Sequence, residues 1–254
     1  MTDHVIVTDE DATRVITMRR PDKKNALTQG MYFAMADAIT SAQTDDGIRS
    51  IVISGGSGVF TAGNDLEDFA KANTSNSDAD RPRAATTFLK ALADNEKPLI
   101  GAVDGIAVGV GTTMLFHCDY VLASTTATFS TPFIHLGLVP EAASSLLAPR
   151  AMGHHRAFSM LVMGRTVSAE EAREAGFVNV VVASGHTEVE ARKVAREIGA
   201  LPKGAVALTR KLLKPPREDI IRRMDEESRH FGERLKSDEA RNAFMAFFAR
   251  KKKA

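Results

Sequence analysis

The stretch that decides the fold is Ala102–Asp119, AVDGIAVGVGTTMLFHCD, where glycines connect an apolar run to a helical pattern. Leu99–Val103 is a short apolar segment of the kind that forms a buried strand. After the glycine-rich turn, the pattern predicts a helix from about Gly111 to His117. Tyr120–Ala123 then predicts another strand. This alternation indicates a mixed α/β core.

An earlier stretch, Phe60–Phe69 (FTAGNDLEDF), has the same character, and it follows the buried strand predicted over Ser50–Ser54. Asp65 is a candidate cap for a short helix from Leu66. Glycine lets backbone N–H groups approach a ligand closely, and N–H groups at a helix start are unpaired. Two of them converging on one oxygen would form an oxyanion hole. Ordinary tight turns remain the alternative.

Outside these two stretches, the first 195 residues continue to alternate between strand and helix signals. Ser168 and Glu171 have the spacing of a capping box at a helix start. Asn73–Pro82 is polar and predicts a loop, either a lid over a pocket or an unstructured connection. The remaining elements expected here are strands Val5–Thr8, Arg14–Met18 and Val178–Val182, and helices from Thr28 to about Ala42 and from Arg83 to Asn95.

Beyond about residue 195 only helical patterns with charged faces remain. The expected domain organisation is therefore an α/β core over residues 1–195 and a helical C-terminal region over residues 196–254. The expected helices cover Thr187–Ile198, Gly204–Leu213, Arg217–Phe231 and Asp238–Arg250.

The bulk composition excludes several classes of protein. The chain has 254 residues, 33 Lys plus Arg and 32 Asp plus Glu, so its net charge of +1 gives no argument for nucleic acid as a partner. The single cysteine, Cys118, excludes an intrachain disulfide and a cysteine-based metal cluster. Gly105–Cys118, the most apolar window, has about 14 residues where a membrane span needs about 20. We expect no membrane association and a cytoplasmic location.

Common cofactor and hydrolase motifs are incomplete in this sequence. Gly109-Val-Gly111 would continue to a third glycine in a dinucleotide fingerprint, but that position is Met114. No Gly-x-Ser-x-Gly motif marks a serine hydrolase. His154 and His155 are adjacent, so on a helix they point in different directions and do not suit one metal ion. We expect no metal and no cofactor.

Glu141 is the acid that stands out, because it lies in the apolar stretch His135–Pro149 (HLGLVPEAASSLLAP). Burying an unpaired carboxylate costs several kcal/mol unless it is protonated or hydrogen-bonded. A carboxyl group with a raised pKa suits a general base that removes a proton from carbon near neutral pH. The alternative is that Glu141 begins a helix after Pro140, where an acid is favourable.

Together these motifs resemble the enoyl-CoA hydratase/isomerase (crotonase) superfamily over nearly the whole chain. The resemblance implies a spiral of ββα turns, a helical C-terminal region used for trimer formation, and binding of acyl-CoA thioesters with stabilisation of an enolate. The matching stretches are Arg20–Leu27 (RPDKKNAL), Phe60–Leu66, Ala102–Gly111, Gly164-Arg165 and Ala169–Gly176 leading into Val178.

By motif position, the resemblance assigns the two oxyanion N–H groups to Asn64 and Val110. Hydratases of this family use two glutamates, whose positions are occupied here by Thr113 and Phe133. Neither residue can transfer a proton near neutral pH as a carboxyl group does. A single glutamate at the position of Glu141 resembles the Δ3,Δ2-enoyl-CoA isomerase subgroup.

The resemblance therefore implies isomerisation of 3-enoyl-CoA to trans-2-enoyl-CoA in fatty-acid β-oxidation, with Glu141 as the base and coenzyme A as part of the substrate. A homotrimer or a dimer of trimers is expected. Hydratase or other enolate chemistry on CoA thioesters is an alternative, and a non-catalytic acyl-CoA or RNA binding protein is another. The substrate-binding residues implied by motif position are Lys24, Ala26, Leu27, Ala62, Gly63, Asp65, Leu66 and Gly109, with Phe133, Leu136 and Leu138 as walls of the acyl pocket. Phe248 and Lys251 either reach the adenine pocket of a neighbouring subunit or belong to a solvated basic helix end.

Overall fold

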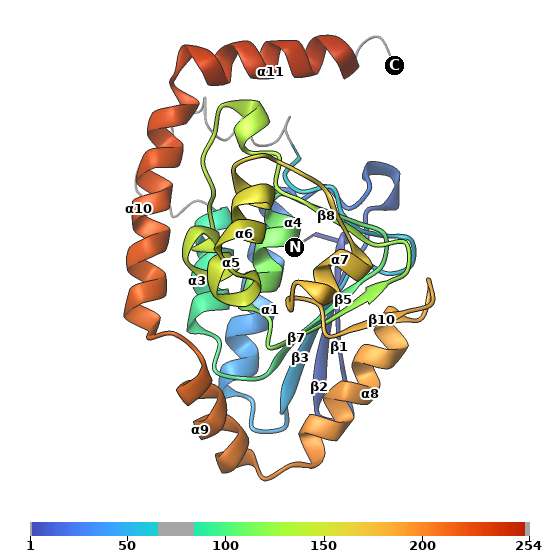
Figure 1. Ribbon diagram of the computed structural model, residues 1–254. Coiled ribbons are helices and arrows are strands. Elements are labelled where there is room, and N and C mark those ends of the chain that lie inside the picture. The colour runs from blue at the N-terminus through green and yellow to red at the C-terminus, as the bar shows by residue number, and fades with distance from the viewer. Residues whose placement is uncertain (1, 66–83, 252–254) are drawn as a thin grey trace.

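A computed structural model describes residues 2–65 and 84–251 of the chain (Figure 1). The predicted helix from Leu66 and the loop Asn73–Pro82 lie outside the described residues. The larger of two sheets has six strands in the order β1-β2-β3-β5-β7-β10, parallel throughout except for the first pair. Its strands are β1 (Val5–Glu10), β2 (Thr13–Met18), β3 (Ser50–Ser54), β5 (Leu99–Val103), β7 (Tyr120–Ser124) and β10 (Val180–Val182).

The central strands of this sheet are apolar along their length because both faces of the sheet are covered. In β3, Ile51 and Ile53 belong to the main core, whereas Val52 lies on the opposite face. Helix α8 (Thr187–Ala200) covers that opposite face with Ala191 and Ala195. The sheet is therefore the middle layer of the core, with helices on each side.

The smaller sheet has four strands in the order β4-β6-β8-β9, and its short strands were not expected from the sequence. Strands of two or three residues are too short to show a periodic pattern. Each turn of the chain places one strand in the large sheet and the next in the small sheet, which gives the expected spiral. The strands are β4 (Val59–Thr61), β6 (Ile106–Val108), β8 (Thr128–Ser130) and β9 (Val167–Ser168).

Most helices of the core follow the predicted pattern. Thr28 caps α1 through a hydrogen bond from the Met31 N–H, and the capping box of Ser168 and Glu171 is confirmed. The helix expected over Gly111–His117 is divided into a short α4 and a 3-10 turn, and α5 and α6 were not expected. The helices are α1 (Gln29–Thr44), α3 (Ala84–Asp94), α4 (Val110–Thr113), the turn Met114–His117, α5 (Ser144–Met152), α6 (His154–Leu161) and α7 (Ala169–Glu174).

The C-terminal part is helical as predicted: after α8 come α9 (Lys203–Leu213), α10 (Arg217–Leu235) and α11 (Asp238–Lys251). In Figure 1, α10 runs along one side of the molecule. Helix α11 crosses the top of the molecule and is far from α8 and α9. The predicted boundary at residue 195 falls inside α8, and the division into two domains stays a prediction. None of the helices in the described ranges is long and apolar enough to cross a bilayer.

Asn25 explains why the segment around residues 20–27 is needed for the fold. Its φ is +52° and it is buried. Its side-chain amide donates to the carbonyl oxygens of Gly55, Val59 and Phe60 at 2.9, 3.0 and 3.1 Å. Its Oδ1 accepts the Arg20 N–H at 2.7 Å. One side chain therefore holds the segment against the end of β3 and the start of β4.

Candidate active site

The two glycine-containing loops meet where Gly63 passes the end of β6. Gly63 has a φ of +84°, and a Cβ on it would lie 2.6 Å from the carbonyl oxygen of Val108. Only glycine allows this backbone conformation and this approach without strain. On its other side the loop is fixed by Leu27, whose N–H donates to the Gly63 carbonyl at 2.8 Å and whose carbonyl accepts the Asp65 N–H at 2.9 Å.

Asn64 and Val110, the predicted oxyanion donors, both line one cavity of about 340 Å³. Within the described ranges neither backbone N–H donates a hydrogen bond. Gly109, with a φ of +58°, directs the chain into α4 so that Val110 is the first helical residue. An N–H at that position has no acceptor inside its own helix. The wall of the cavity therefore contains two residues whose backbone N–H groups are not used by hydrogen bonds in the described part of the chain.

Glu141 lies beside α4, where it contacts Thr113, three residues after Val110. Its carboxyl group accepts a hydrogen bond from the hydroxyl of Thr113, which is fully buried. The Glu141 side chain therefore points into the protein, although the residue is only half-buried and is not among those that line the 340 Å³ cavity. The alternative that Glu141 begins a helix is wrong, because α5 begins at Ser144 after Ala142 and Ala143, which have left-handed backbone conformations.

The surroundings of Glu141 give it the proton affinity of a base that works near neutral pH. Burial, which disfavours the charged form, raises its pKa from 4.5 to about 7. The hydrogen bond from Thr113 opposes this increase, and the nearby negative charge of Glu227 adds to it. At pH 7 the carboxyl group therefore exists in both protonation states and can accept a proton and return it.

Tyr32 of α1 lies between Asn64 and Glu141, and its only signal in the sequence was an apolar helix face. It is 1% exposed, and its hydroxyl donates to Oδ1 of Asn64 at 2.6 Å. Burial and, to a lesser extent, the charge of Glu141 raise the pKa of Tyr32 well above its usual value. Tyr32 is therefore a neutral donor that fixes Asn64 and lies close to Glu141.

Replacing Tyr32 by phenylalanine removes this donor and keeps the ring that packs against Phe88. We expect Tyr32→Phe to lower kcat by about tenfold, because Asn64 becomes less well positioned, a smaller loss than removal of an oxyanion donor causes. KM should change by less. Steady-state kinetics on an enoyl-CoA substrate measure both constants. An unchanged kcat would contradict a role for the hydroxyl in positioning Asn64.

The walls of the cavity come from both parts of the chain. Phe133, Leu136 and Leu138, predicted as acyl-pocket residues, all line it. Phe231 of α10 packs edge-on against Phe133, with ring centroids 6.4 Å apart, and Phe244 of α11 is also in the wall. The C-terminal helices were predicted only as the region used for trimer formation, so this contribution to the cavity wall was not expected. Their aromatic residues were the available signal.

The residues predicted to contact CoA divide into three groups. Ala26, Ala62, Gly63, Asp65 and Gly109 line the cavity. Lys24 is exposed and Leu27 is buried in the core, so neither of them lines the cavity. Arg20 and Lys23, which were not predicted, do line it. Asp65 forms an ion pair with Arg20 at 2.7 Å. Leu66 and the side chains of Phe248 and Lys251 lie outside the described parts of the structure.

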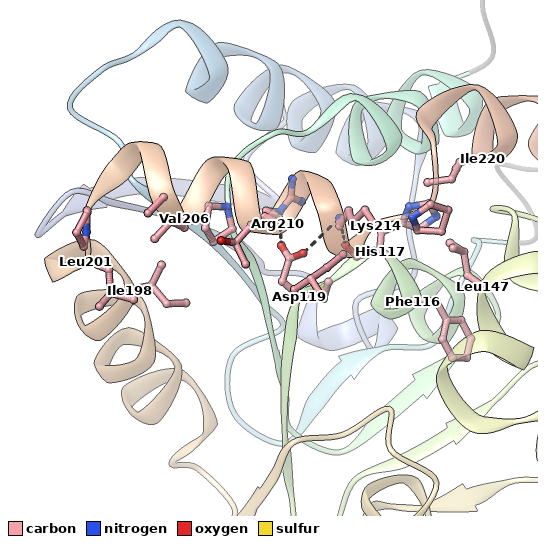
Figure 2. A pocket seen from close by; sticks show the side chains of 17 residues that line it. Phe116, His117, Asp119, Leu147, Ile198, Leu201, Val206, Arg210, Lys214 and Ile220 are labelled. Carbon is pink, nitrogen blue, oxygen red and sulfur yellow. Dashed lines mark hydrogen bonds and ion pairs between the residues drawn. The ribbon is translucent and has the colours of Figure 1, made fainter.

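A larger cavity, of about 640 Å³, lies between α9 and the core, away from the site (Figure 2). Figure 2 shows Asp119 between Arg210 and Lys214, which it contacts at 2.7 and 3.5 Å. Arg210 also donates to the Asn95 carbonyl at 2.8 Å. These charges are paired with one another, so they attach α9 to the core. Across the described ranges, no group of three His, Cys, Asp or Glu is placed to hold a metal ion.

Comparison with known proteins gives the same assignment. Residues 8–254 match the family described as enoyl-CoA hydratase/isomerase. The chain is 35% identical over 252 residues to enoyl-CoA delta isomerase 2 of Rattus norvegicus, covering 98% of this chain but only 64% of the rat protein. It is 32% identical over 253 residues to enoyl-CoA delta isomerase 3, peroxisomal, of Mus musculus, covering 98% of this chain and 80% of the mouse protein.

A crystal structure of an enoyl-CoA hydratase/isomerase from Pseudoalteromonas atlantica T6c has the same fold. Its TM-score is 0.92 at 38% sequence identity, with 98% of each chain covered. The predicted spiral of ββα turns is thereby confirmed. With the family match over residues 8–254, these likenesses lead to one conclusion: the chain belongs to the enoyl-CoA hydratase/isomerase family.

Proposed function

We propose that this protein converts 3-enoyl-CoA thioesters into trans-2-enoyl-CoA thioesters, with Glu141 as the only acid and base. The observation that carries the proposal is the position of Glu141, held against α4 by Thr113 with a pKa of about 7. Thr113 and Phe133 occupy the two positions where hydratases of the family have glutamates. The two curated relatives described above are named as delta isomerases, which supports the same chemistry.

In the proposed reaction, the ionised Glu141 carboxylate removes a proton from C2, the carbon next to the thioester carbonyl. The electrons of the C2–H bond form the dienolate, and its oxygen accepts hydrogen bonds from the N–H groups of Asn64 and Val110. Because these donors face charge that develops during the reaction, they favour the dienolate over the ground-state carbonyl. Glu141 then returns the proton to C4, and the double bond moves to C2–C3.

A single carboxyl group is sufficient for this reaction because the proton is moved and no water is added. The same group must be a base in the first step and an acid in the second, and a pKa of about 7 suits both steps near neutral pH. The apolar wall of Phe133, Leu136 and Leu138 is suited to the acyl chain. Lys23 and Arg20, which also line the cavity, are candidates to face the phosphates of CoA.

The proposed reaction is tested most directly with purified protein. We expect conversion of 3-enoyl-CoA to 2-enoyl-CoA, and hydration of 2-enoyl-CoA at a rate at least about 10²-fold lower, because the two carboxyl groups of a hydratase are replaced. Product analysis by chromatography distinguishes the reactions. Efficient hydration would reject the isomerase proposal in favour of a hydratase, and turnover of neither substrate would favour a binding protein. The trimeric assembly and the cytoplasmic location stay predictions.

A further inference from the structure

The segment that carries Glu141 has a backbone that needs support from the rest of the protein. Ala142 and Ala143, directly after it, have φ values of +61° and +54°. Residues other than glycine adopt this left-handed conformation at an energetic cost and keep it only where neighbouring groups enforce it. Whatever holds Ala142 and Ala143 therefore also determines where Glu141 points.

Glu227 of α10 provides most of this support. It is 6% exposed. Its Oε2 accepts the Ala143 N–H at 2.6 Å, and its Oε1 accepts the Ser145 N–H at 2.9 Å and the Ser145 hydroxyl at 2.5 Å. Arg223, one turn earlier on α10, donates to the same hydroxyl at 3.2 Å. A carboxylate with three donors is a strong anchor, because each hydrogen bond is charge-assisted.

Other polar groups of the segment are also hydrogen-bonded. His117 contacts the Ala142 carbonyl through Nε2 at 2.8 Å. Burial lowers the pKa of His117 to about 4, so the ring is neutral and Nε2–H is the donor. The N–H and hydroxyl of Ser144 donate to the Glu141 carbonyl at 3.0 and 2.6 Å. Glu227 and Arg223 are the charged residues that contact this segment, and both come from α10.

We propose that Glu227 is a positioning residue that holds the turn at Ala142–Ala143 and thereby sets the place of the Glu141 carboxyl group. This inference rests on the proposed function of Glu141 as the base. It gives α10 a part in the reaction beyond the apolar wall that Phe231 supplies. Glu227 itself is hydrogen-bonded to backbone and to Ser145, so it acts through Glu141.

The charges around Glu141 determine the pH behaviour of a Glu227 variant. Tyr32 from α1 and His117 from the 3-10 turn are neutral near pH 7, and Thr113 from α4 donates a hydrogen bond. From α10, Glu227 raises the pKa of Glu141, and Arg223 lowers that of Glu227. Burial raises the pKa of Glu227, against its hydrogen bonds. Removing the charge of Glu227 should therefore lower the pKa of Glu141.

The test is Glu227→Gln, with Glu233→Gln as the matched control because Glu233 is exposed on the same helix. We expect Glu227→Gln to lower kcat on 3-enoyl-CoA by about tenfold or more and to change KM by less than about threefold. The acidic limb of the kcat/KM profile should move to lower pH by at least about half a unit, because a like charge is removed. Glu233→Gln should match the wild type in all three readouts.

If Glu227 has a purely structural role, Glu227→Gln should have a lower melting temperature. Its kcat and the acidic limb of its pH profile, measured below that temperature, should then equal those of the wild type, and this result would overturn the inference. If Glu227→Gln does not fold, Ser145→Ala decides, because it removes one of the three donors to Glu227. A several-fold loss of kcat at constant KM supports the inference, and wild-type kinetics overturn it. If Glu141→Gln keeps full activity, the proposed function of Glu141 as the base is wrong. If Glu141→Gln loses activity but Glu227→Gln keeps wild-type kinetics, only the positioning role of Glu227 is wrong.

Discussion

Glu141→Gln is expected to lower kcat for the isomerisation of 3-enoyl-CoA by at least about 10²-fold, the contribution of a general base. Glutamine has nearly the same shape and can still accept the hydrogen bond from Thr113, so the site should keep its structure. The two N–H groups of Asn64 and Val110 remain, and KM should change little. Initial rates followed at several substrate concentrations give both constants.

The matched control is Glu170→Gln, since Glu170 is an exposed acid of α7 that forms an ion pair with Arg173 on the surface. It should keep the kinetic constants of the wild type. A loss of only a few-fold in Glu141→Gln would remove Glu141 from its proposed role. Such a result would require another base or a reaction that does not begin with removal of the C2 proton.

The same substitution should also change how stability depends on pH. The pKa of Glu141 is 4.5 when exposed and about 7 in the folded protein. A carboxyl group with a raised folded pKa destabilises the folded state as pH increases through this interval, and the full effect is present above pH 7. Glu141→Gln should therefore unfold at a higher urea concentration than the wild type at pH 8. Its free energy of unfolding should be higher by at most about 3 kcal/mol. Toward pH 4.5 this difference should disappear.

How much of the molecule its sequence can predict depends on how far apart the interacting residues are. Strands β3 and β5 were predicted at their observed bounds because burial on both faces makes them continuously apolar. The strands of two or three residues in the small sheet were missed because their positions depend on pairing between successive turns of the chain. Local patterns in the sequence therefore predict the buried strands of the large sheet, but they carry very little information about the short strands of the small sheet.

The same distinction applies to the candidate site. Glycine at positions 63 and 109 and an acid in an apolar stretch are local signals. They made the two loops and Glu141 candidates, and the resemblance to the family assigned their roles. Alanine gives no sign that it adopts a left-handed conformation, so the turn after Glu141 was not predicted. Glu227 resembles any other acid on a charged helix until the fold brings it to Ser145. Tyr32 likewise reads as a core residue, and only its hydroxyl contact with Asn64 distinguishes it.

Gly63→Ala is expected to cause the second large loss of activity. Its Cβ would lie 2.6 Å from the Val108 carbonyl oxygen, and this oxygen is a backbone atom that cannot move independently of β6. The first loop must therefore shift, and with it Asn64, which lines the cavity together with Val110. Loss of one oxyanion donor lowers kcat by about 10²- to 10³-fold in acyl-transfer enzymes, and we expect a similar decrease here.

Gly58→Ala separates the effect of the collision from the effect of backbone strain. Gly58 has a φ of +88°, close to the +84° of Gly63, but a Cβ on it would have no atom within 4 Å. Backbone strain should cost both variants about 1–2 kcal/mol of stability, because alanine is disfavoured in the left-handed region, and the collision should lower the stability of Gly63→Ala further. Only Gly63→Ala should also lose kcat. Equal kinetics for the two variants at a temperature where both are folded would mean that the close approach of Gly63 to Val108 does not position the Asn64 N–H.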